Sequence, residues 1–220
     1  MAKIKIYNEV QRTASGSKET TILVEGKNIV DALYDIERIN PNLNIAVLDH
    51  ACYKKPAPMF LKGYSGIEES LCQNSELYNI LTSIDMANFY KYNSKNLNKG
   101  LYLNRGFYIE DVKFNNGKTF NIIGATSPNR EMSIRYKRFT DEENDEALNS
   151  RLDFILSIAA INNVDILVMS SFGCNVYKQD INKVSSFLKE LLLNKYKNTF
   201  KTVLIADDKN TNYNVWKSTF

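Results

Sequence analysis

Four short apolar runs recur along this chain, each followed by polar or small residues. They lie at residues 20–25 (TTILVE), 45–48 (IAVL), 164–169 (VDILVM) and 202–207 (TVLIAD). Runs of this length, rich in β-branched residues, are typical of strands buried in a sheet. The fold must therefore cover a largely parallel sheet with other elements on both faces.

Segments with a helical spacing of apolar residues separate these strands. They are residues 28–39, 147–162 and about 180–193, and a further helix is expected from Ser65 to about Leu81. The first strand, helix and strand favour a parallel pair, because a helix makes the crossover. The fold class predicted from this alternation is α/β.

The remaining segments give weaker signals. Residues 106–112 and 119–124 are expected to be strands, joined by the hairpin-type turn Asn115-Asn116-Gly117. Residues 1–19 are polar and are interpreted as an opening helix or arm. Residues 82–104 show no clear period, and residues 131–146 are interpreted as a charged connection that ends in a solvated acidic run.

Length and composition limit the classes of protein. The 220 residues suit one domain, with residues 1–19 as an N-terminal extension, and 44% hydrophobic residues are enough for a large core. The net charge of +3 fits an anionic small ligand but gives no strong nucleic-acid signal, and no apolar stretch is long enough to span a membrane.

Cysteine and histidine usage points away from a metal site. Cys52, Cys72 and Cys174 have no metal-ligand spacing, and the chain has one His. We therefore expect no metal and no cofactor. An odd number of cysteines and no signal-peptide pattern favour a cytoplasmic protein with reduced thiols.

The segment that follows the strand at 45–48 contains the strongest candidate site. Asp49 and His50 end the strand, a loop broken by prolines follows, and a helix then begins near Ser65 with the adjacent acids Glu68 and Glu69. In α/β sheets, ligands bind beyond the carboxyl ends of the strands, where loops lead into helices. Acids placed there are suited to chemistry on a bound nucleotide or sugar.

A purely structural interpretation of the same residues is available. Ser65-Gly66-Ile67-Glu68 fits a capping box, in which Ser65 caps the helix and Glu68 reaches back to the Ser65 amide. Glu69 would then be an acid in the first turn, favoured by the helix dipole.

A second candidate loop follows the strand at 164–169. Residues 170–177 (SSFGCNVY) are mostly small, and a helix follows them. A strand, a small-residue loop and a helix together present backbone amides to a phosphate. Residues 125–130 (ATSPNR) form a third segment at a strand end, for which a simple turn with Pro as punctuation is the alternative.

Taken in order, these segments resemble the microbial-type poly(ADP-ribose) glycohydrolases, a branch of the macrodomain superfamily. In that family a strand ending in Asn leads through a Pro-Gly-Gly-Gly loop to a Gln-Glu-Glu helix start. Residues 47–49, 55–56, 60–63 and 68–72 are similar to this signature, residues 106–112 to a family strand, residues 125–129 to an Ala-Pro-Asn segment, and residues 173–177 to a Gly-Cys-Gly-Ala-Phe loop. The resemblance implies a macrodomain-like α/β/α fold with a mixed, mostly parallel sheet.

The chain also departs from the family pattern. Ala57, Pro58 and Met59 stand where the family has three glycines. Glycines let the backbone approach phosphate oxygens, whereas Pro58 has no amide to offer. Ile67 replaces the Gln, and Asp49 replaces the Asn. In the second loop, Asn175 replaces a glycine.

The resemblance implies an ADP-ribose ligand, free, polymeric or attached to a macromolecule, and residues that bind it. Glu69 matches the general acid and base that would cleave an ADP-ribosyl O-glycosidic bond, and Glu68 matches the neighbour that holds the ribose hydroxyls. The other expected ligand-binding residues are Asp49, Pro56, Ala57, Pro58, Met59, Phe60, Asn129, Ser171, Phe172, Gly173, Cys174, Asn175, Val176 and Tyr177.

Three functions compete at this point. The retained pair Glu68-Glu69 favours a hydrolase acting on an ADP-ribosyl linkage. The lost glycines and the lost Gln favour a catalytically impaired binding module that sequesters or senses an ADP-ribose-derived nucleotide signal. A structural α/β domain without a ligand is the third.

Overall fold

Seven strands form one sheet in the computed structural model, which describes residues 2–10 and 16–220. The strand order is β1-β4-β5-β3-β6-β7-β2, and β4 alone of the seven runs opposite to the others. The strands are β1 (Lys3–Tyr7), β2 (Thr21–Glu25), β3 (Ile45–His50), β4 (Gly106–Lys113), β5 (Thr119–Ala125), β6 (Ile166–Met169) and β7 (Thr202–Ala206).

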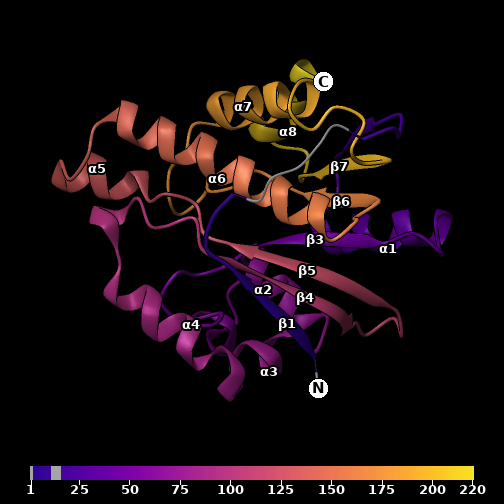
Figure 1. The fold of residues 1–220 in the computed structure, drawn as a ribbon, viewed down its shortest axis with the longest axis horizontal. Coiled ribbons are helices and arrows are strands. Elements are labelled where there is room, and N and C mark those ends of the chain that lie inside the picture. Colours follow the sequence, from indigo (N-terminus) through magenta and orange to yellow (C-terminus); the bar gives the residue numbers. More distant parts are fainter. Residues whose placement is uncertain (1, 11–15) are drawn as a thin grey trace.

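Helices cover both faces of this sheet (Figure 1). They are α1 (Ile29–Ile39), α2 (Ile67–Gln73), α3 (Leu77–Leu81), α4 (Ile84–Lys95), α5 (Arg130–Tyr136), α6 (Asp141–Ile161), α7 (Ile181–Leu193) and α8 (Thr211–Thr219), with 3-10 turns η1 (Phe60–Lys62) and η2 (Asn98–Gly100). Helices α1 to α4 pack on one face, and α6, α7 and α8 pack on the other. The predicted three-layer α/β/α arrangement is confirmed.

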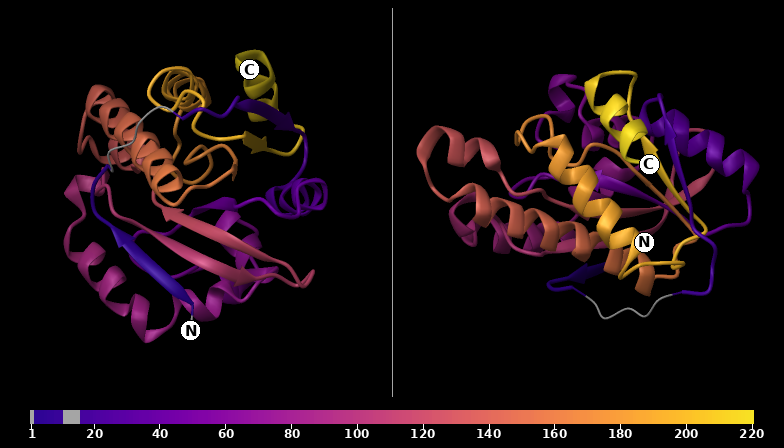
Figure 2. Two further views of the ribbon diagram at one scale, coloured as in Figure 1. Left: turned by 45° about the vertical axis from the view of Figure 1, so that its right-hand side comes forward. Right: turned by 90° about the horizontal axis from the view of Figure 1, so that it is seen from above.

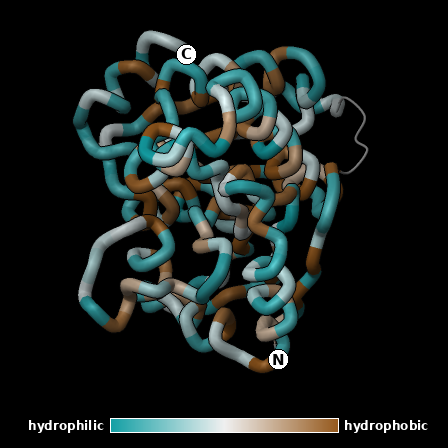
Figure 3. Tube along the Cα trace, turned by 90° about the vertical axis from the view of Figure 1, so that its left-hand side faces the viewer, coloured by the Kyte–Doolittle hydropathy of each residue, from teal (hydrophilic) through white to brown (hydrophobic). Residues whose placement is uncertain are grey.

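Alternation along the strands divides the core into two clusters. In β3, Ile45 and Val47 face α1 to α4, whereas Ala46 and Leu48 face α6 to α8. Strands buried on both faces read as continuous apolar runs, which explains the sequence pattern. The hydrophobic segments of the trace accordingly concentrate in the middle of the molecule (Figure 3), and α6 and α7 lie side by side over the sheet (Figure 2).

The prediction of a helix or arm in residues 1–19 was wrong for residues 3–7, which form strand β1. The residues KIKIY alternate between Lys and Ile, a period of two. Lys3 and Lys5 form ion pairs with Glu110 of the neighbouring strand at 2.8 and 2.6 Å. Lysines on an outer strand also oppose pairing with other chains. Residues 11–15 lie outside the described residues.

The single helix expected from Ser65 to Leu81 is divided into α2 and α3. The break at residues 74–76 comes from the β4–β5 hairpin, because the Asn115 amide donates to the Asn74 carbonyl and the Glu76 amide donates to the Lys113 carbonyl. Ser75 Oγ also donates to the Leu71 carbonyl and accepts from the Leu77 amide, which ends one helix and starts the next.

Two segments without an expected helix are helical. Helix α4 buries Met86, Phe89, Tyr90 and Asn93, a helical spacing. The supposed charged connection contains α5 and the first turns of α6, which begins at Asp141 with a capping box between Thr140 and Glu143. Strands β2 and β3 run parallel, as expected. They are not neighbours in the sheet, however, because β6 and β7 lie between them.

The carboxyl ends of β3, β5, β6 and β7 meet at one edge of the sheet, and the loops that follow them gather there. In the part of the chain that the structure describes, no helix is both long enough and apolar enough to cross a bilayer.

Gly124 allows β5 to pack beside β4 at this edge, and its replacement tests that contact. A Cβ at residue 124 would collide with the Phe107 ring, which is buried in the core. We expect Gly124→Ala to lower the free energy of unfolding by about 1–3 kcal/mol, measured by urea denaturation. As a comparison, Gly117→Ala adds a methyl group in open space at a positive φ and should cost about 1–2 kcal/mol through backbone strain alone. Wild-type stability for Gly124→Ala would contradict the packing.

Candidate active site

Asp49 and His50 point to opposite faces of the sheet because side chains alternate along β3. Asp49 lies on the α2 side and is fully buried. The His50 ring packs edge-on against Phe172 at 5.2 Å, and its Nε2 lies 3.3 Å from Ser170 Oγ. Burial lowers the pKa of His50 to about 3, so this imidazole is neutral at physiological pH. The neutral His50, on the other face of β3, is therefore not a candidate for the acid beside Asp49.

The capping box proposed for Ser65 and Glu68 does not form. The N-cap of α2 is Gly66, without a side-chain capping bond. Glu68 instead turns towards β3, where its Oε2 accepts a hydrogen bond from the Cys52 amide at 3.2 Å. The Glu68 side chain is only 3% exposed. Its position favours the functional interpretation over the structural one.

Glu69 folds back over the start of its own helix. Its Oε2 occupies the space that a Cβ of residue 66 would fill. Gly66 therefore makes room for the carboxylate, and Glu69 is 9% exposed. On a helix, neighbouring side chains diverge by about 100°, so Glu68 and Glu69 face different partners.

Three carboxyl groups thus share one buried region. Burial raises the pKa of Asp49 well above its usual range, and the charge of Glu69 adds to the shift. Burial and then Asp49 raise the pKa of Glu68, while the Cys52 and Ala57 amides oppose the shift.

Several polar atoms in this region lack a hydrogen-bond partner among the described residues. They are both carboxylate oxygens of Asp49, Glu68 Oε1 and the Tyr90 hydroxyl. Tyr90 lies on α4 and interacts electrostatically with Glu68 and Asp49. Buried polar groups in proteins are nearly always hydrogen-bonded, so these atoms indicate a place for a polar ligand. Tyr90 was missed because its segment showed no clear period.

The loop after β3 carries the substituted glycine positions. Ala57 is buried and has a φ of 33°, a backbone region that favours glycine. A hydrogen bond from its amide opposes the rise in the pKa of Glu68. Pro58 is exposed, whereas Pro56 and Met59 are partly exposed. The Phe60 ring packs on Tyr78 of α3 at 4.4 Å, so this side chain contributes to packing.

The loop after β6 is held in a tight turn. Gly173 has a φ of 78°, and a Cβ there would collide with Ser127. The Gln179 amide donates to the Gly173 carbonyl, and Gln179 Nε2 donates to the Pro128 carbonyl at 2.8 Å. Gln179 and Asn144 also exchange side-chain hydrogen bonds. These bonds fix the loop against the segment after β5.

The predicted residues of this loop have different environments. The Ser171 amide and hydroxyl both donate to Asp207, and Phe172 is buried in the core. These two side chains are therefore engaged away from Glu68 and Glu69. Cys174 is partly exposed, while Asn175 and Val176 are exposed.

Tyr177 brings the second loop to the carboxyl groups. Its hydroxyl interacts electrostatically with Cys52 and Glu68. The Tyr177 ring lies 6.1 Å from the Tyr102 ring, which stacks on Tyr53 at 4.2 Å. The two loops are therefore linked through Tyr102, in a wall formed by Tyr53, Tyr102 and Tyr177. Tyr53 and Tyr102 were not predicted, since nothing in their local sequence marks them.

Asn129, at the end of the segment after β5, lies beside this wall. Its amide donates to the Gly100 carbonyl at 2.9 Å, and its side-chain Oδ1 is buried without a partner. The neighbouring Thr126 hydroxyl donates to the Ala51 carbonyl, and the buried Arg151 donates to the Thr126 carbonyl. The interpretation as a simple turn leaves the orphaned Asn129 oxygen unexplained.

A cavity of about 440 Å³ adjoins the start of α2. It is lined by the starts of α1 and α2, by Asn175 and by the residues after β7. Asp31, Asp207 and Asp208 supply acceptors, while Ile29 and Ile67 supply apolar surface. Sequence reasoning missed this cavity, because its walls come from four separate segments.

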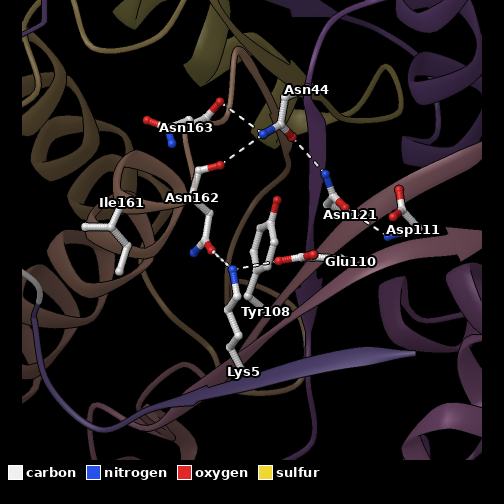
Figure 4. Close-up of a pocket in the computed structure, with 9 residues that line it drawn as sticks. All are labelled: Lys5, Asn44, Tyr108, Glu110, Asp111, Asn121, Ile161, Asn162 and Asn163. Carbon is white, nitrogen blue, oxygen red and sulfur yellow. Dashed lines mark hydrogen bonds and ion pairs between the residues drawn. The ribbon is translucent and has the colours of Figure 1, made fainter. Parts of the chain in front are cut away.

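A second cavity, of about 320 Å³, lies at the opposite edge of the sheet (Figure 4). Its polar groups bond to one another: Asn44 donates to the Asn162 and Asn163 carbonyls and accepts from Asn121. Lys5 bonds to Asn162 and Glu110. These satisfied groups close the edge of the sheet, so we place the active site at the carboxyl edge. Within residues 2–10 and 16–220, no group of three His, Cys, Asp or Glu residues has the geometry to hold a metal ion.

Comparisons with known proteins converge on one family. Residues 1–116 match the family model described as "Microbial-type PARG, catalytic domain". The fold is similar to that of poly(ADP-ribose) glycohydrolase (PARG) from Deinococcus radiodurans in complex with ADP-ribose, with a TM-score of 0.86 and 25% identity over 98% of this chain and 93% of that chain. The structure of PARG from Thermomonospora curvata is similar with a TM-score of 0.85 and 22% identity, over 99% of this chain and 85% of that chain. No curated protein matches the sequence.

The family match covers one part of the site, whereas the fold similarity extends over nearly the whole chain. Asp49, residues 56–60 and the pair Glu68-Glu69 lie within the matched residues 1–116. Residues 125–129 and 171–177 lie beyond them, in the part for which the comparison rests on the fold.

The burial of Asp49 predicts an unusual pH dependence of stability. Because its folded pKa is raised, Asp49 favours folding at low pH and loses that contribution as pH rises through the folded pKa. Above about 3.9, the pKa of an unfolded aspartate, the loss approaches about 1.4 kcal/mol per pH unit. Urea denaturation should therefore show Asp49→Asn gaining stability relative to wild type as pH rises. A difference that does not change with pH would contradict this assignment.

Proposed function

Because this chain belongs to the microbial-type poly(ADP-ribose) glycohydrolase family, we propose that it recognises ADP-ribose and hydrolyses an ADP-ribosyl O-glycosidic bond. The observation that supports the reaction is the arrangement of Asp49, Glu68 and Glu69, which lie together and buried where the two loops meet. The family match confirms the resemblance that the loop sequences indicated. The D. radiodurans relative was crystallised with ADP-ribose, which supports the ligand.

In the proposed reaction, Glu69 gives its proton to the leaving oxygen as the bond from the distal ribose C1 to that oxygen breaks. An oxocarbenium-like sugar forms. Water then adds to C1, and the Glu69 carboxylate takes the proton that water releases. Gly66 supports this role, because the missing Cβ lets the Glu69 carboxylate lie over the start of α2.

Glu68 has a different role in this proposal. The Cys52 amide fixes its Oε2, and its Oε1 remains available to accept from the ribose hydroxyls. Tyr177, which approaches Glu68 from the second loop, would pack on the sugar. The unpaired Oδ1 of Asn129 would accept from the same end of the ligand.

The diphosphate would lie between residues 56–60 and residues 171–177, whose backbone turns at Ala57 and Gly173. The adenosine end would enter the cavity of about 440 Å³. That cavity is lined by Gly66, whose missing Cβ leaves room for the Glu69 carboxylate, and by Asp31, Asp207 and Asp208. Acceptors there suit an amino group on a base, and Ile29 and Ile67 suit its apolar faces.

Two broader features belong to the same proposal. We take residues 1–220 as a single macrodomain-like domain, supported by a sheet whose strands come from both halves of the chain. Three free cysteines support a reducing compartment, the cytoplasm.

A binding module remains the second candidate, because Pro58 supplies no amide where the family has a glycine. Such a protein would take up an ADP-ribose-derived nucleotide and release it intact. Incubation with ADP-ribosylated protein or polymer, followed by mass spectrometry of the bound and free species, separates the two candidates. Free ADP-ribose appearing with time supports the hydrolase, whereas intact ligand supports the binding module.

The variant Glu69→Gln tests whether Glu69 is the general acid. Because the amide cannot donate and recover a proton in the same way, we expect release of ADP-ribose from polymer to be lost, while the Kd for ADP-ribose stays within about tenfold of wild type. Glu142→Gln, an exposed change on α6, is the matched control and should leave both unchanged. Equal rates for wild type and Glu69→Gln would remove Glu69 from the mechanism.

The loop substitutions predict a second outcome. Glycines at positions 57, 58 and 59 together should strengthen ADP-ribose binding by calorimetry, since position 58 regains an amide, and one amide bond to a charged oxygen contributes about 1.5–3 kcal/mol, or roughly one to two decades. Pro58→Gly alone adds an amide and should account for most of the gain. Ala57→Gly adds none and is the matched control. If the triple variant binds no better, this loop does not contact the diphosphate.

A further inference from the structure

Three segments of the chain join beside the wall of tyrosines. The amide of Asn129, at the start of α5, donates to the Gly100 carbonyl of η2 at 2.9 Å, and the Glu131 amide of α5 donates to the Tyr177 carbonyl at 3.2 Å. The Tyr177 ring in turn lies 6.1 Å from the ring of Tyr102, which follows η2. Helix α5 thus begins at the wall and leads to the outer edge of the molecule (Figure 1). We call residues 99, 130–138 and 178 the α5 rim.

Each of these three segments carries an exposed lysine in the left-handed backbone conformation. The φ angles are 58° for Lys99, 51° for Lys137 and 57° for Lys178. Lys137 ends α5 at the position where glycine is usual, because a Cβ is disfavoured there. Backbone geometry favours glycine at all three positions, so it does not account for the three positive charges.

The charges of the α5 rim are only partly neutralised within the protein. Three of its cations lie next to acids of α5 or of the start of α6, in the pairs Arg130 with Asp141, Arg135 with Glu131, and Lys99 with Glu143. Among the residues that the structure describes, Lys137, Arg138 and Lys178 form no ion pair. These three side chains can therefore bind an anion without breaking a contact to an acid.

An aromatic ring accompanies the unpaired cations. Residues 134–138 are all exposed, Tyr136 is 59% exposed, and the Arg138 guanidinium lies 5.9 Å from the centre of its ring. Exposed rings beside cations bind chains of nucleotides, because a base stacks on the ring and the cations contact phosphates. The seven residues of α5 span about 10 Å. The end of α5 is therefore within the length of one nucleotide of Tyr177.

The α5 rim lies outside the space that the proposed function assigns to the rest of the ligand. The residues that line the cavity of about 440 Å³ come from α1, α2, Asn175 and the segment after β7, and none of them belongs to the rim. The adenosine of the bound unit therefore does not use the rim. Its free cations remain for whatever is attached on the other side of the cleaved bond.

We propose that the α5 rim is a second binding site for polymeric substrate, which takes the ADP-ribose unit on the leaving-group side of the cleaved bond. This inference rests on the proposed function, in which the distal sugar lies beside Glu69 and Tyr177 packs on it. The leaving oxygen then belongs to the next unit of the polymer. The diphosphate of that unit contacts Lys137 and Lys178, and its adenine stacks on Tyr136. Free ADP-ribose has no such unit, so the rim strengthens the binding of polymer alone.

The double variant Lys137→Gly/Lys178→Gly tests the rim, because it removes two charges and places glycine where the backbone favours it. In Glu69→Gln protein, which keeps the polymer intact, fluorescence anisotropy measures the Kd for labelled ADP-ribose polymer and calorimetry the Kd for ADP-ribose. We expect polymer affinity to fall by about twofold to thirtyfold, since two exposed charge contacts are lost, while ADP-ribose affinity is unchanged. The slope of log Kd against log salt concentration for polymer should fall by about one to two.

Two further variants separate a binding site from a general effect of charge. Lys197→Gln/Lys217→Gln removes the same charge from exposed positions before β7 and on α8, and it should leave both affinities unchanged. Tyr136→Ala removes the stacking ring and should weaken polymer binding by about fivefold or more, without changing the Kd for ADP-ribose.

The outcomes separate this inference from the proposed function. Polymer affinity that is equal with and without the two rim lysines, or that falls as much in the Lys197/Lys217 control, overturns the rim and leaves the hydrolase proposal standing. If the rim variant instead loses affinity for a single-stranded DNA oligonucleotide while polymer affinity is unchanged, the rim binds nucleic acid and the inference is wrong. Binding of neither ADP-ribose nor polymer to the wild type overturns both proposals. A thermal melt of the rim variant at least as high as that of its parent verifies the fold.

Discussion

Asp49, Glu68 and Glu69 are buried carboxyl groups that form no ion pair with a Lys or Arg among the described residues, and the carboxyl edge of this sheet is built around them. Each nearby feature makes their burial tolerable in a different way. The Cys52 amide donates to Glu68, and the missing Cβ of Gly66 gives the Glu69 carboxylate a place over the helix start. Asp49 has no such group among the described residues, and burial raises its pKa well above the usual range. A site that served stability alone would replace such groups by apolar ones, because buried charges are costly.

The loops around these acids are positioned by buried polar side chains that bond to backbone carbonyls. Arg151 is fully buried without a carboxylate partner and donates to Thr126 and Leu101 carbonyls as well as to Asn104. Burial lowers the pKa of Arg151 to about 10, which still leaves it charged at neutral pH. Gln179 Nε2 likewise donates a hydrogen bond to the Pro128 carbonyl. A charged guanidinium can satisfy several carbonyls at once, so the segment before β4 and the segments after β5 and β6 keep one arrangement.

Local signals predicted much of this fold, and tertiary contacts explain most of what they missed. The buried strands were predictable because strands covered on both faces read as apolar runs. The capping box Thr140-x-x-Glu143 marks the start of α6 in the sequence. It was missed because the acidic residues around it were interpreted as a solvated connection. The break after α2 was not predictable from its own residues, because the β4–β5 hairpin supplies the bonds that end the helix. Tyr53 and Tyr90 join the site from distant segments, so no local pattern could place them beside the linear pair Glu68-Glu69.

The departures from the family pattern belong to one electrostatic problem. An ionised Asp49 would add a third negative charge beside a ligand that carries a diphosphate, and the loss of the Pro58 amide would remove a group that attracts it. The Ala57 amide favours the charged form of Glu68, so the same substituted loop that loses a phosphate contact also acts on the acid beside it. The three carboxyl groups thus have different surroundings: the Cys52 amide fixes Glu68, the missing Cβ of Gly66 makes room for Glu69, and Asp49 has no hydrogen-bond donor among the described residues.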